Sequence, residues 1–272
     1  MTLISPQPFW TVLLPIIGAI AMRIANDKNT RLHHVLAVAT IFLVFINVVL
    51  MVPAILSGKT IEHKLLQIVG NTGIFFRVDA LGIILGLVAS SLWVLATVYS
   101  IGYMHGEHNQ KGYFVFFVLS CSAVMGIAFA SNLFTLYIFY EYLTICTYPL
   151  VVHARTLEAT RAGIKYICYG LAGDAFLFLA LFLTNYLAGT LEFIPGGILS
   201  TAAEDNIFLL TVLFFLLITG FGIKAAAMPL HSWLPGAMVA PTPVSALLHA
   251  VAVVKAGVFG IIRVLYFLYG IQ

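Results

Sequence analysis

Charged residues are the scarcest feature of this sequence. Its 272 residues include 13 Lys or Arg and 10 Asp or Glu, so 8% are charged, against about 25% in soluble globular domains. So few charges cannot cover the surface of a soluble domain of this size, and they also exclude a disordered chain, which is polar and charge-rich. Apolar residues make up 62% of the chain, and the mean hydropathy is +1.07. The composition predicts an integral membrane protein.

Other missing features narrow the function. No basic run suggests nucleic acid, and the formal net charge is only +3. The three cysteines, Cys121, Cys146 and Cys168, lie in apolar segments without CxxC spacing, so we expect them to be packing residues and expect no metal or cofactor site. Met1 to Met22 contains no charge and therefore lacks the basic start of a secretory signal. This segment is predicted to be a retained first helix.

Eight apolar stretches are long enough to cross about 30 Å of hydrocarbon as helices. They are Ser5 to Met22, His34 to Leu56, Ala80 to Tyr103, Tyr113 to Ala130, Leu133 to Val152, Ala162 to Ala188, Phe208 to Ala227, and Val244 to Tyr269. Barrel strands would instead appear as alternating segments of about ten residues. The sequence therefore predicts an all-α polytopic membrane protein with about eight transmembrane helices.

The loops predict the orientation. The segment Ser57 to Arg77 contains two strand-like runs around Gly70-Asn71-Thr72-Gly73, which predicts an external β-hairpin. The loops after the first, third, fifth and seventh helices carry most of the loop cations, namely Arg23, Lys28, Arg31, Lys111, Arg155 and Arg161. The positive-inside rule places these loops on the cytoplasmic side and the N-terminus outside. The expected location is a cell inner membrane.

Ionisable residues inside the spans are the candidate functional residues, because each costs about 2.5–3.5 kcal/mol at mid-bilayer on insertion scales. Glu141 lies in the middle of the fifth span, and Tyr137, Thr144 and Tyr148 share its helical stripe. The alternative for Glu141 is a carboxyl that only bonds a neighbouring helix.

Lys224 and His231 lie on either side of Met228-Pro229. Pro229 is expected to break the seventh helix, and a helix broken at membrane depth is tolerated only inside protein or beside a water-filled cavity. Transporters place ion sites at such breaks. The alternative is that Lys224 extends to the cytoplasmic interface.

The sixth and eighth spans carry four more candidates. His249 and Lys255 are six residues apart, about 9 Å along a helix and about 120° around it, so they would line a broad cavity or serve successive sites. Lys165 and Asp174 are nine residues apart and lie on opposite faces, so they cannot face one cavity. The alternatives are a packed neutral histidine, a lysine at a helix flank and a structural aspartate. Arg263 is expected to be a structural or interface residue.

This mixture of charges favours proton movement. Burial favours the neutral form of a lysine, whereas a nearby carboxylate favours its charged form, so a Glu–Lys pair can take up and release a proton. Ion-channel filters use rings of carbonyls or of like charges, which this set does not match.

Several segments resemble one family. Phe221 to Pro235, Ala240 to Ala250 and Val254 to Gly257, together with Tyr140 to Leu150, Ala162 to Ile167 and Tyr99 to His105, are similar to the proton-pumping antiporter-like membrane subunits. That family serves respiratory complex I, membrane-bound hydrogenases and multisubunit cation/proton antiporters. The resemblance covers essentially the whole sequence.

The resemblance implies roles for the candidates. Glu141 corresponds to the family's helix-five glutamate, which modulates its partner, and Lys224 to the broken-helix lysine that holds the proton. His249 and Lys255 correspond to relay positions leading toward the second half of the subunit. Lys165 fits a position near the cytoplasmic uptake side, and Asp174 resembles an aspartate of some branches.

The resemblance also implies a domain division. Family members contain two inverted five-helix repeats. Residues 1–112 correspond to the three leading helices with the hairpin, and residues 113–272 to the first repeat, helices four to eight. A partner chain, or more of the same chain, would supply the second repeat.

We therefore expect a subunit that works among other membrane subunits and carries protons, exchanged for Na⁺ in a multisubunit cation/proton antiporter. The alternatives are a pumping subunit of NADH:quinone oxidoreductase or of a membrane-bound hydrogenase, and a scaffold that transports nothing. A stand-alone redox enzyme is a further alternative that would require a bound haem, flavin or metal.

Overall fold

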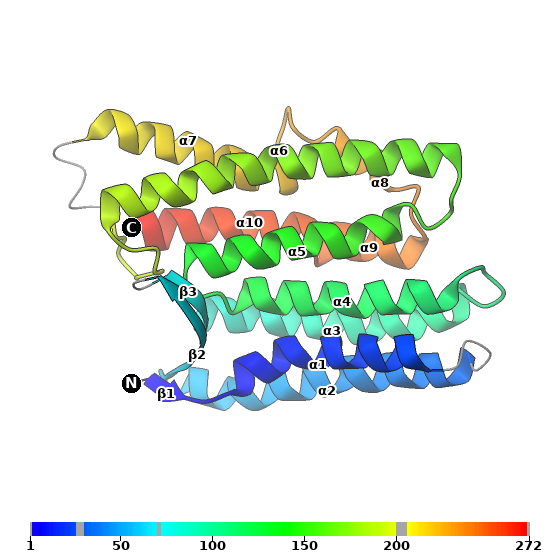
Figure 1. Cartoon of the computed structure of the whole chain (residues 1–272). Coiled ribbons are helices and arrows are strands. Elements are labelled where there is room, and N and C mark those ends of the chain that lie inside the picture. Colours follow the sequence, from blue (N-terminus) through cyan, green and yellow to red (C-terminus); the bar gives the residue numbers. More distant parts are fainter. Residues whose placement is uncertain (1, 26–29, 70–71, 200–205, 271–272) are drawn as a thin grey trace.

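The computed structural model describes residues 2–25, 30–69, 72–199 and 206–270. Long helices run side by side, and a small β-sheet lies at one end of them, which we call the hairpin end (Figure 1). Helices α1, α3 and α5 end at the opposite end of the bundle, which we call the basic end because Arg23, Lys111 and Arg155 lie there (Figure 1). The predicted all-α membrane fold is confirmed. Lys28, Gly70 and Asn71 lie outside the described residues.

The strands and helices are each numbered in the order in which they follow one another along the chain. The strands are β1 (Thr2–Ile4), β2 (Thr60–Val69) and β3 (Thr72–Val78). The helices are α1 (Gln7–Ile24), α2 (Thr30–Leu56), α3 (Ala80–Tyr103), α4 (Gln110–Ala128), α5 (Leu133–Val151), α6 (Leu157–Ala188), α7 (Ile207–Lys224), α8 (Trp233–Ala237), α9 (Thr242–Ala250) and α10 (Val253–Arg263), followed by the π-helical segment η2 (Val264–Tyr269).

Seven helical segments of the described residues are long and apolar enough to cross a membrane. They are α1, α2, α3, α4, α6, α7 and the stretch Thr242–Tyr269, which contains α9, α10 and η2. Helix α5 has 19 residues but is less apolar, because it carries Glu141 and four tyrosines. A total of eight spans therefore stays a prediction, with α5 as the eighth.

Local side-chain chemistry explains where several helices begin and end. Asp79, Asn132 and Thr156 each accept a hydrogen bond from a backbone N–H of the first turn of α3, α5 and α6, which satisfies a donor that the helix itself leaves unpaired. The cap at Thr156 begins α6 five residues before the predicted start at Ala162. Helix α6 ends at Gly189, whose φ of +67° suits glycine.

The sheet confirms the predicted hairpin. Strands β2 and β3 pair antiparallel, and β1 pairs parallel to the start of β2, so the order is β1-β2-β3. Strand β3 is hydrogen-bonded to the helical bundle. Arg77 N donates to Phe129 O (2.8 Å), and Ser131 N donates to Phe75 O (3.1 Å). The sheet is thereby attached to the connection between α4 and α5.

The hairpin end is further held by charged groups. Arg77 forms an ion pair with Glu62 (Nε–Oε1 2.6 Å), lies 3.8 Å from a carboxylate oxygen of Glu192, and donates to Phe193 O (3.0 Å). Since Glu192 and Phe193 belong to the connection between α6 and α7, one arginine links the sheet to that connection.

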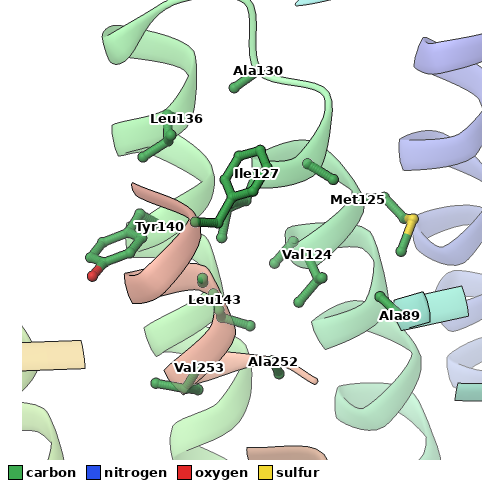
Figure 2. Close-up of a cluster of buried hydrophobic side chains, with 14 of the residues drawn as sticks. Ala89, Val124, Met125, Ile127, Ala130, Leu136, Tyr140, Leu143, Ala252 and Val253 are labelled. Carbon is green, nitrogen blue, oxygen red and sulfur yellow. The ribbon is translucent and has the colours of Figure 1, made fainter. Parts of the chain in front are cut away.

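The apolar core is continuous through the middle of the bundle. Leu136 and Leu143 of α5 lie opposite Val124 and Ile127 of α4, and Val253 at the start of α10 closes the same cluster (Figure 2). All of these side chains are buried. Helices α4, α5 and α10 therefore form a packed centre, and α5 also carries residues of the candidate site described below.

Arg263 forms the deepest ion pair of the hairpin end. It is 1% exposed at the end of α10, and both terminal nitrogens of its guanidinium donate to Asp79, which caps α3. The rings of Phe193, Phe259 and Phe267 lie within 5.4 Å of the guanidinium carbon. The expected structural role of Arg263 fits this position, since the pair joins the start of α3 to the end of α10.

Replacing Arg263 tests this role. Arg263→Met keeps an apolar stem but leaves Asp79 without its cation, and breaking a buried ion pair typically costs about 3–5 kcal/mol. We expect a lower midpoint of thermal unfolding in detergent for Arg263→Met than for the matched control Arg161→Met, whose side chain is exposed on α6. Equal midpoints would contradict the structural role.

Candidate functional site

Lys224 is the centre of the candidate site. It is the last residue of α7 and only 2% exposed. Its Nζ donates to the backbone oxygen of Tyr140 (2.6 Å) and to Oδ1 of Asp174 (3.4 Å), and it lies 3.4 Å from the centroid of the Tyr140 ring. An ammonium group so enclosed requires such partners, because an isolated buried charge is very costly. The side chain points into the bundle and does not extend to the interface.

Asp174 supplies the carboxylate closest to this lysine. It lies on α6 and is 2% exposed, and its Oδ2 is buried without a hydrogen-bond partner in the described part of the chain. Two glycines bring the helices together here, since a Cβ on Gly173 would lie only 3.0 Å from Gly220 O. The close approach of α6 to α7 therefore places Asp174 against Lys224.

Glu141 completes the charged group from α5. It is half-buried and accepts a hydrogen bond from Tyr137 (Oη–Oε1 3.1 Å), one turn earlier on the same helix. It interacts electrostatically with both Asp174 and Lys224. Two carboxyl groups from different helices thus act on one lysine, with Asp174 as the direct contact.

The end of α7 beside Lys224 is itself stabilised by side chains. Trp233 donates its indole N–H to Ile223 O (2.7 Å), which also accepts from Ala226 N (3.1 Å) in the turn after the helix. The chain then turns through Ala226, whose φ is +55°, toward α8. Helix α7 ends five residues before Pro229, and a break caused by that proline stays a prediction.

The other predicted candidates lie apart from this group. Lys165 is exposed on the face of α6 opposite Asp174, as the nine-residue spacing predicts. Lys255 is exposed on α10, and His249 is half-buried on α9. His231 is half-buried in the turns after α7. The structure therefore brings together Glu141, Asp174 and Lys224 only.

Sequence reasoning missed Tyr140. Its backbone oxygen and its ring both contact the ammonium of Lys224, and its hydroxyl donates to Phe221 O (3.4 Å). The residue precedes Glu141, but no side-chain pattern marks a backbone carbonyl as a partner. Only the packing of α5 against α7 reveals it.

The described residues contain no group of three or more His, Cys, Asp or Glu side chains placed to hold a metal ion. What this geometry can do is hold or release one proton on a buried amine flanked by two carboxyl groups.

Comparison with known proteins establishes the family. The model of the family described as "NADH:quinone oxidoreductase/Mrp antiporter, TM" matches residues 130–272, which is more than half of the sequence. The chain belongs to this family. The resemblance seen in the sequence is confirmed, and the chain is a multi-pass membrane protein.

Among curated relatives, the "NAD(P)H-quinone oxidoreductase subunit 5, chloroplastic" of Lotus japonicus is 29% identical over 273 residues, covering 96% of this chain and 36% of the relative. The protein of the same name from Glycine max is 34% identical over 196 residues, covering 70% of this chain and 26% of the relative. The matched part of this chain thus spans about a quarter to a third of the length of these relatives.

Two solved structures share the fold. A chain of the membrane-bound sulfane sulfur reductase, an archaeal respiratory membrane complex, superimposes with a TM-score of 0.82 at 24% identity, covering 98% of this chain and 55% of that one. A chain of the Mrp complex from Dietzia sp. DQ12-45-1b gives 0.83 at 20% identity, covering 97% and 49%. Each of these two chains belongs to a complex.

A charge-removal pair tests the contact between Asp174 and Lys224. Asp174→Asn leaves the ammonium without its direct counter-charge, so we expect a loss of about 3–5 kcal/mol in the free energy of unfolding. Adding Lys224→Met should recover much of this loss, because no buried charge then remains unpaired. The measurement is thermal unfolding in detergent, with Glu158→Gln on the exposed first turn of α6 as control. A double variant no more stable than Asp174→Asn would contradict the pairing.

Proposed function

We propose that this chain translocates protons as an antiporter-like subunit of a larger membrane complex. The observation that carries the proposal is the buried Lys224, held by Asp174 and influenced by Glu141 at the end of α7. A purely structural pair would be stable without a second carboxylate. A lysine whose charge depends on two titratable neighbours can instead alternate between two protonation states.

The proposed step is a simple proton exchange. With Asp174 and Glu141 ionised, the ammonium form of Lys224 is favoured, and the Tyr140 carbonyl and ring stabilise it further. When one carboxylate is neutralised or moves away, burial favours the amine, and Nζ gives up one proton to the next acceptor. The site then awaits a new proton, so no permanent pore is required.

His249 and Lys255 fit the onward part of this route. Lys255 is exposed near the start of α10, inside a stretch that is apolar enough to span a membrane. A lysine facing lipid at such a depth is costly, which supports a protein partner against this face. We propose that residues 113–272 form the first translocation repeat and that the second repeat covers Lys255.

The orientation follows the charges. The basic end, with Arg23, Lys111 and Arg155, is proposed to face the cytoplasm, and the hairpin end and the N-terminus to face outward. We propose a cell inner membrane as the membrane in which the chain lies.

Two host complexes remain as finer proposals. A multisubunit Na⁺/proton antiporter is our first choice from the sequence, and the fold shared with the Mrp complex supports it. A quinone oxidoreductase is supported by the names of the curated relatives. Proton transport that needs Na⁺ on the opposite side indicates the antiporter, whereas transport that needs a quinone and an electron donor indicates the oxidoreductase.

Proton transport by the complete complex in sealed vesicles tests the proposed function. Lys224→Ala removes the proton carrier, and Glu141→Gln fixes one neighbour in its neutral form, so both should lower the transport rate by about tenfold or more. Lys64→Ala, on the exposed part of β2, is the matched control and should transport at the parental rate. Undiminished transport by Lys224→Ala in an intact complex would instead favour the scaffold.

Cysteine labelling tests whether a partner covers Lys255. In a background with the exposed Cys168 replaced by Ser, Lys255→Cys should react with a membrane-permeant maleimide when this chain is expressed alone. In the complete complex the same cysteine should be protected several-fold, because the second repeat would lie against it. Equal labelling in both preparations would contradict the proposed interface.

A further inference from the structure

A pair of stacked histidines lies at the basic end, outside the site described above. The rings of His108 and His153 are 4.8 Å apart at 19°, and His108 Nε2 lies 2.8 Å from His153 O. His153 follows the end of α5, is only 7% exposed, and has a buried Nε2 without a hydrogen-bond partner in the part of the chain that the structure describes. His108 is exposed to water, whereas the imidazole of His153 stacked against it is buried.

A cavity of about 190 Å³ lies beside this pair. Its lining includes both histidines, Glu107 and Tyr103, and on the other side Pro241, which precedes α9. The volume is ample for several waters. Water at the basic end can therefore reach the histidine pair.

The buried face of α5 carries polar groups between His153 and the candidate site. Thr147 and Thr144 are buried, and the hydroxyl of Thr147 lies 2.6 Å from that of Tyr166 on α6. Thr144 donates to Tyr140 O (3.3 Å), the same oxygen that accepts from Lys224 Nζ (2.6 Å). A line of hydroxyl and carbonyl groups thus extends from Thr147 to the candidate site.

The apolar side chain of Leu150 separates the histidine pair from the line of hydroxyl groups that begins at Thr147. Leu150 is buried three residues before His153 and three after Thr147, about 4.5 Å along the helix from each. Leu150 and Thr147 also line a small cavity of about 10 Å³ against Leu247 and Leu248 of α9, which is close to the space of one water. Hydrophobic constrictions of this kind gate by excluding water.

The charges around His153 set its protonation. Burial lowers the pKa of His153 below its ordinary value, and the neighbouring His108 and Arg155 lower it further, whereas Glu107 and the hydrogen bond with His108 oppose them. The ring of Tyr113 on α4 also lies against it, at 5.6 Å. His153 is therefore neutral at neutral pH, and it gains a proton as the pH falls.

We propose that His153 takes up protons at the basic end and that the inner face of α5 carries them past Leu150 to Lys224. One proton from water in the 190 Å³ cavity binds the imidazole ring of His153. It then passes through water admitted at Leu150, through the hydroxyls of Thr147 and Thr144, and through water between Thr144 and Lys224 to the neutral amine of Lys224, and His153 returns to its neutral form. Lys165, exposed on the far face of α6, is not on this route. The inference rests on the proposed function.

The test uses the complete complex in sealed vesicles, with the pH varied at the basic end only. The parent's transport rate should rise as that pH falls through the pKa of His153. His153→Gln preserves the side-chain size but cannot titrate, so its rate should fall about tenfold or more and lose this pH step. His105→Gln, at an exposed histidine of the connection between α3 and α4, should keep the parental profile.

The outcomes separate the two proposals. A parental rate and profile in His153→Gln, together with inactive Lys224→Ala, overturns the uptake route alone. Parental transport in Lys224→Ala overturns the proposed function itself. If His153→Gln fails to assemble, Leu150→Thr decides: a hydroxyl in the constriction should admit water and raise the rate several-fold, and an unchanged or lower rate overturns the route.

Discussion

The burial of one ammonium group constrains the rest of the structure. Lys224 lies where α7 ends, and its charge is tolerable only because Asp174, the Tyr140 carbonyl and the Tyr140 ring surround it. Each partner comes from a different place: α6 must approach α7 at Gly173, and α5 must present a backbone oxygen within hydrogen-bond distance. The charged site therefore depends on the close packing of α5, α6 and α7. Loosening any of these contacts would leave a charge uncompensated in an apolar medium.

The hairpin end supplies the rigidity that such a site needs. Arg77 and Arg263 join the sheet, the connection between α6 and α7, and the ends of α3 and α10. The cap at Asp79 serves both α3 and Arg263, so the start of one span and the end of another are fixed by the same carboxylate. The basic end carries the cavity of about 190 Å³ beside His153. In the proposed route, protons enter beside this cavity while the ion pairs of the hairpin end hold the bundle together.

The sequence predicts the membrane class, most helix positions and the hairpin, because these follow from long apolar runs and from turn residues. It also marks Glu141, Asp174 and Lys224, since an ionisable side chain inside an apolar run stands out. It could not rank the two carboxylates around Lys224. Helical spacing fixes which side of α6 carries Asp174, but only the glycine contact between α6 and α7 determines that Asp174 is the nearer one. Backbone partners such as the Tyr140 carbonyl leave no signal in a sequence.

Two lysines of the same bundle illustrate why burial decides their roles. Lys224 is enclosed within this chain and meets its counter-charge here, whereas Lys255 is exposed on α10. Both lie in stretches long and apolar enough to cross a membrane, where an unpaired charge is costly. The first lysine can therefore complete a protonation cycle with groups of this chain, and the second needs groups from outside it. In the proposed route the proton passes from Lys224 toward Lys255, at a surface that a further protein segment would cover, so transport would depend on assembly.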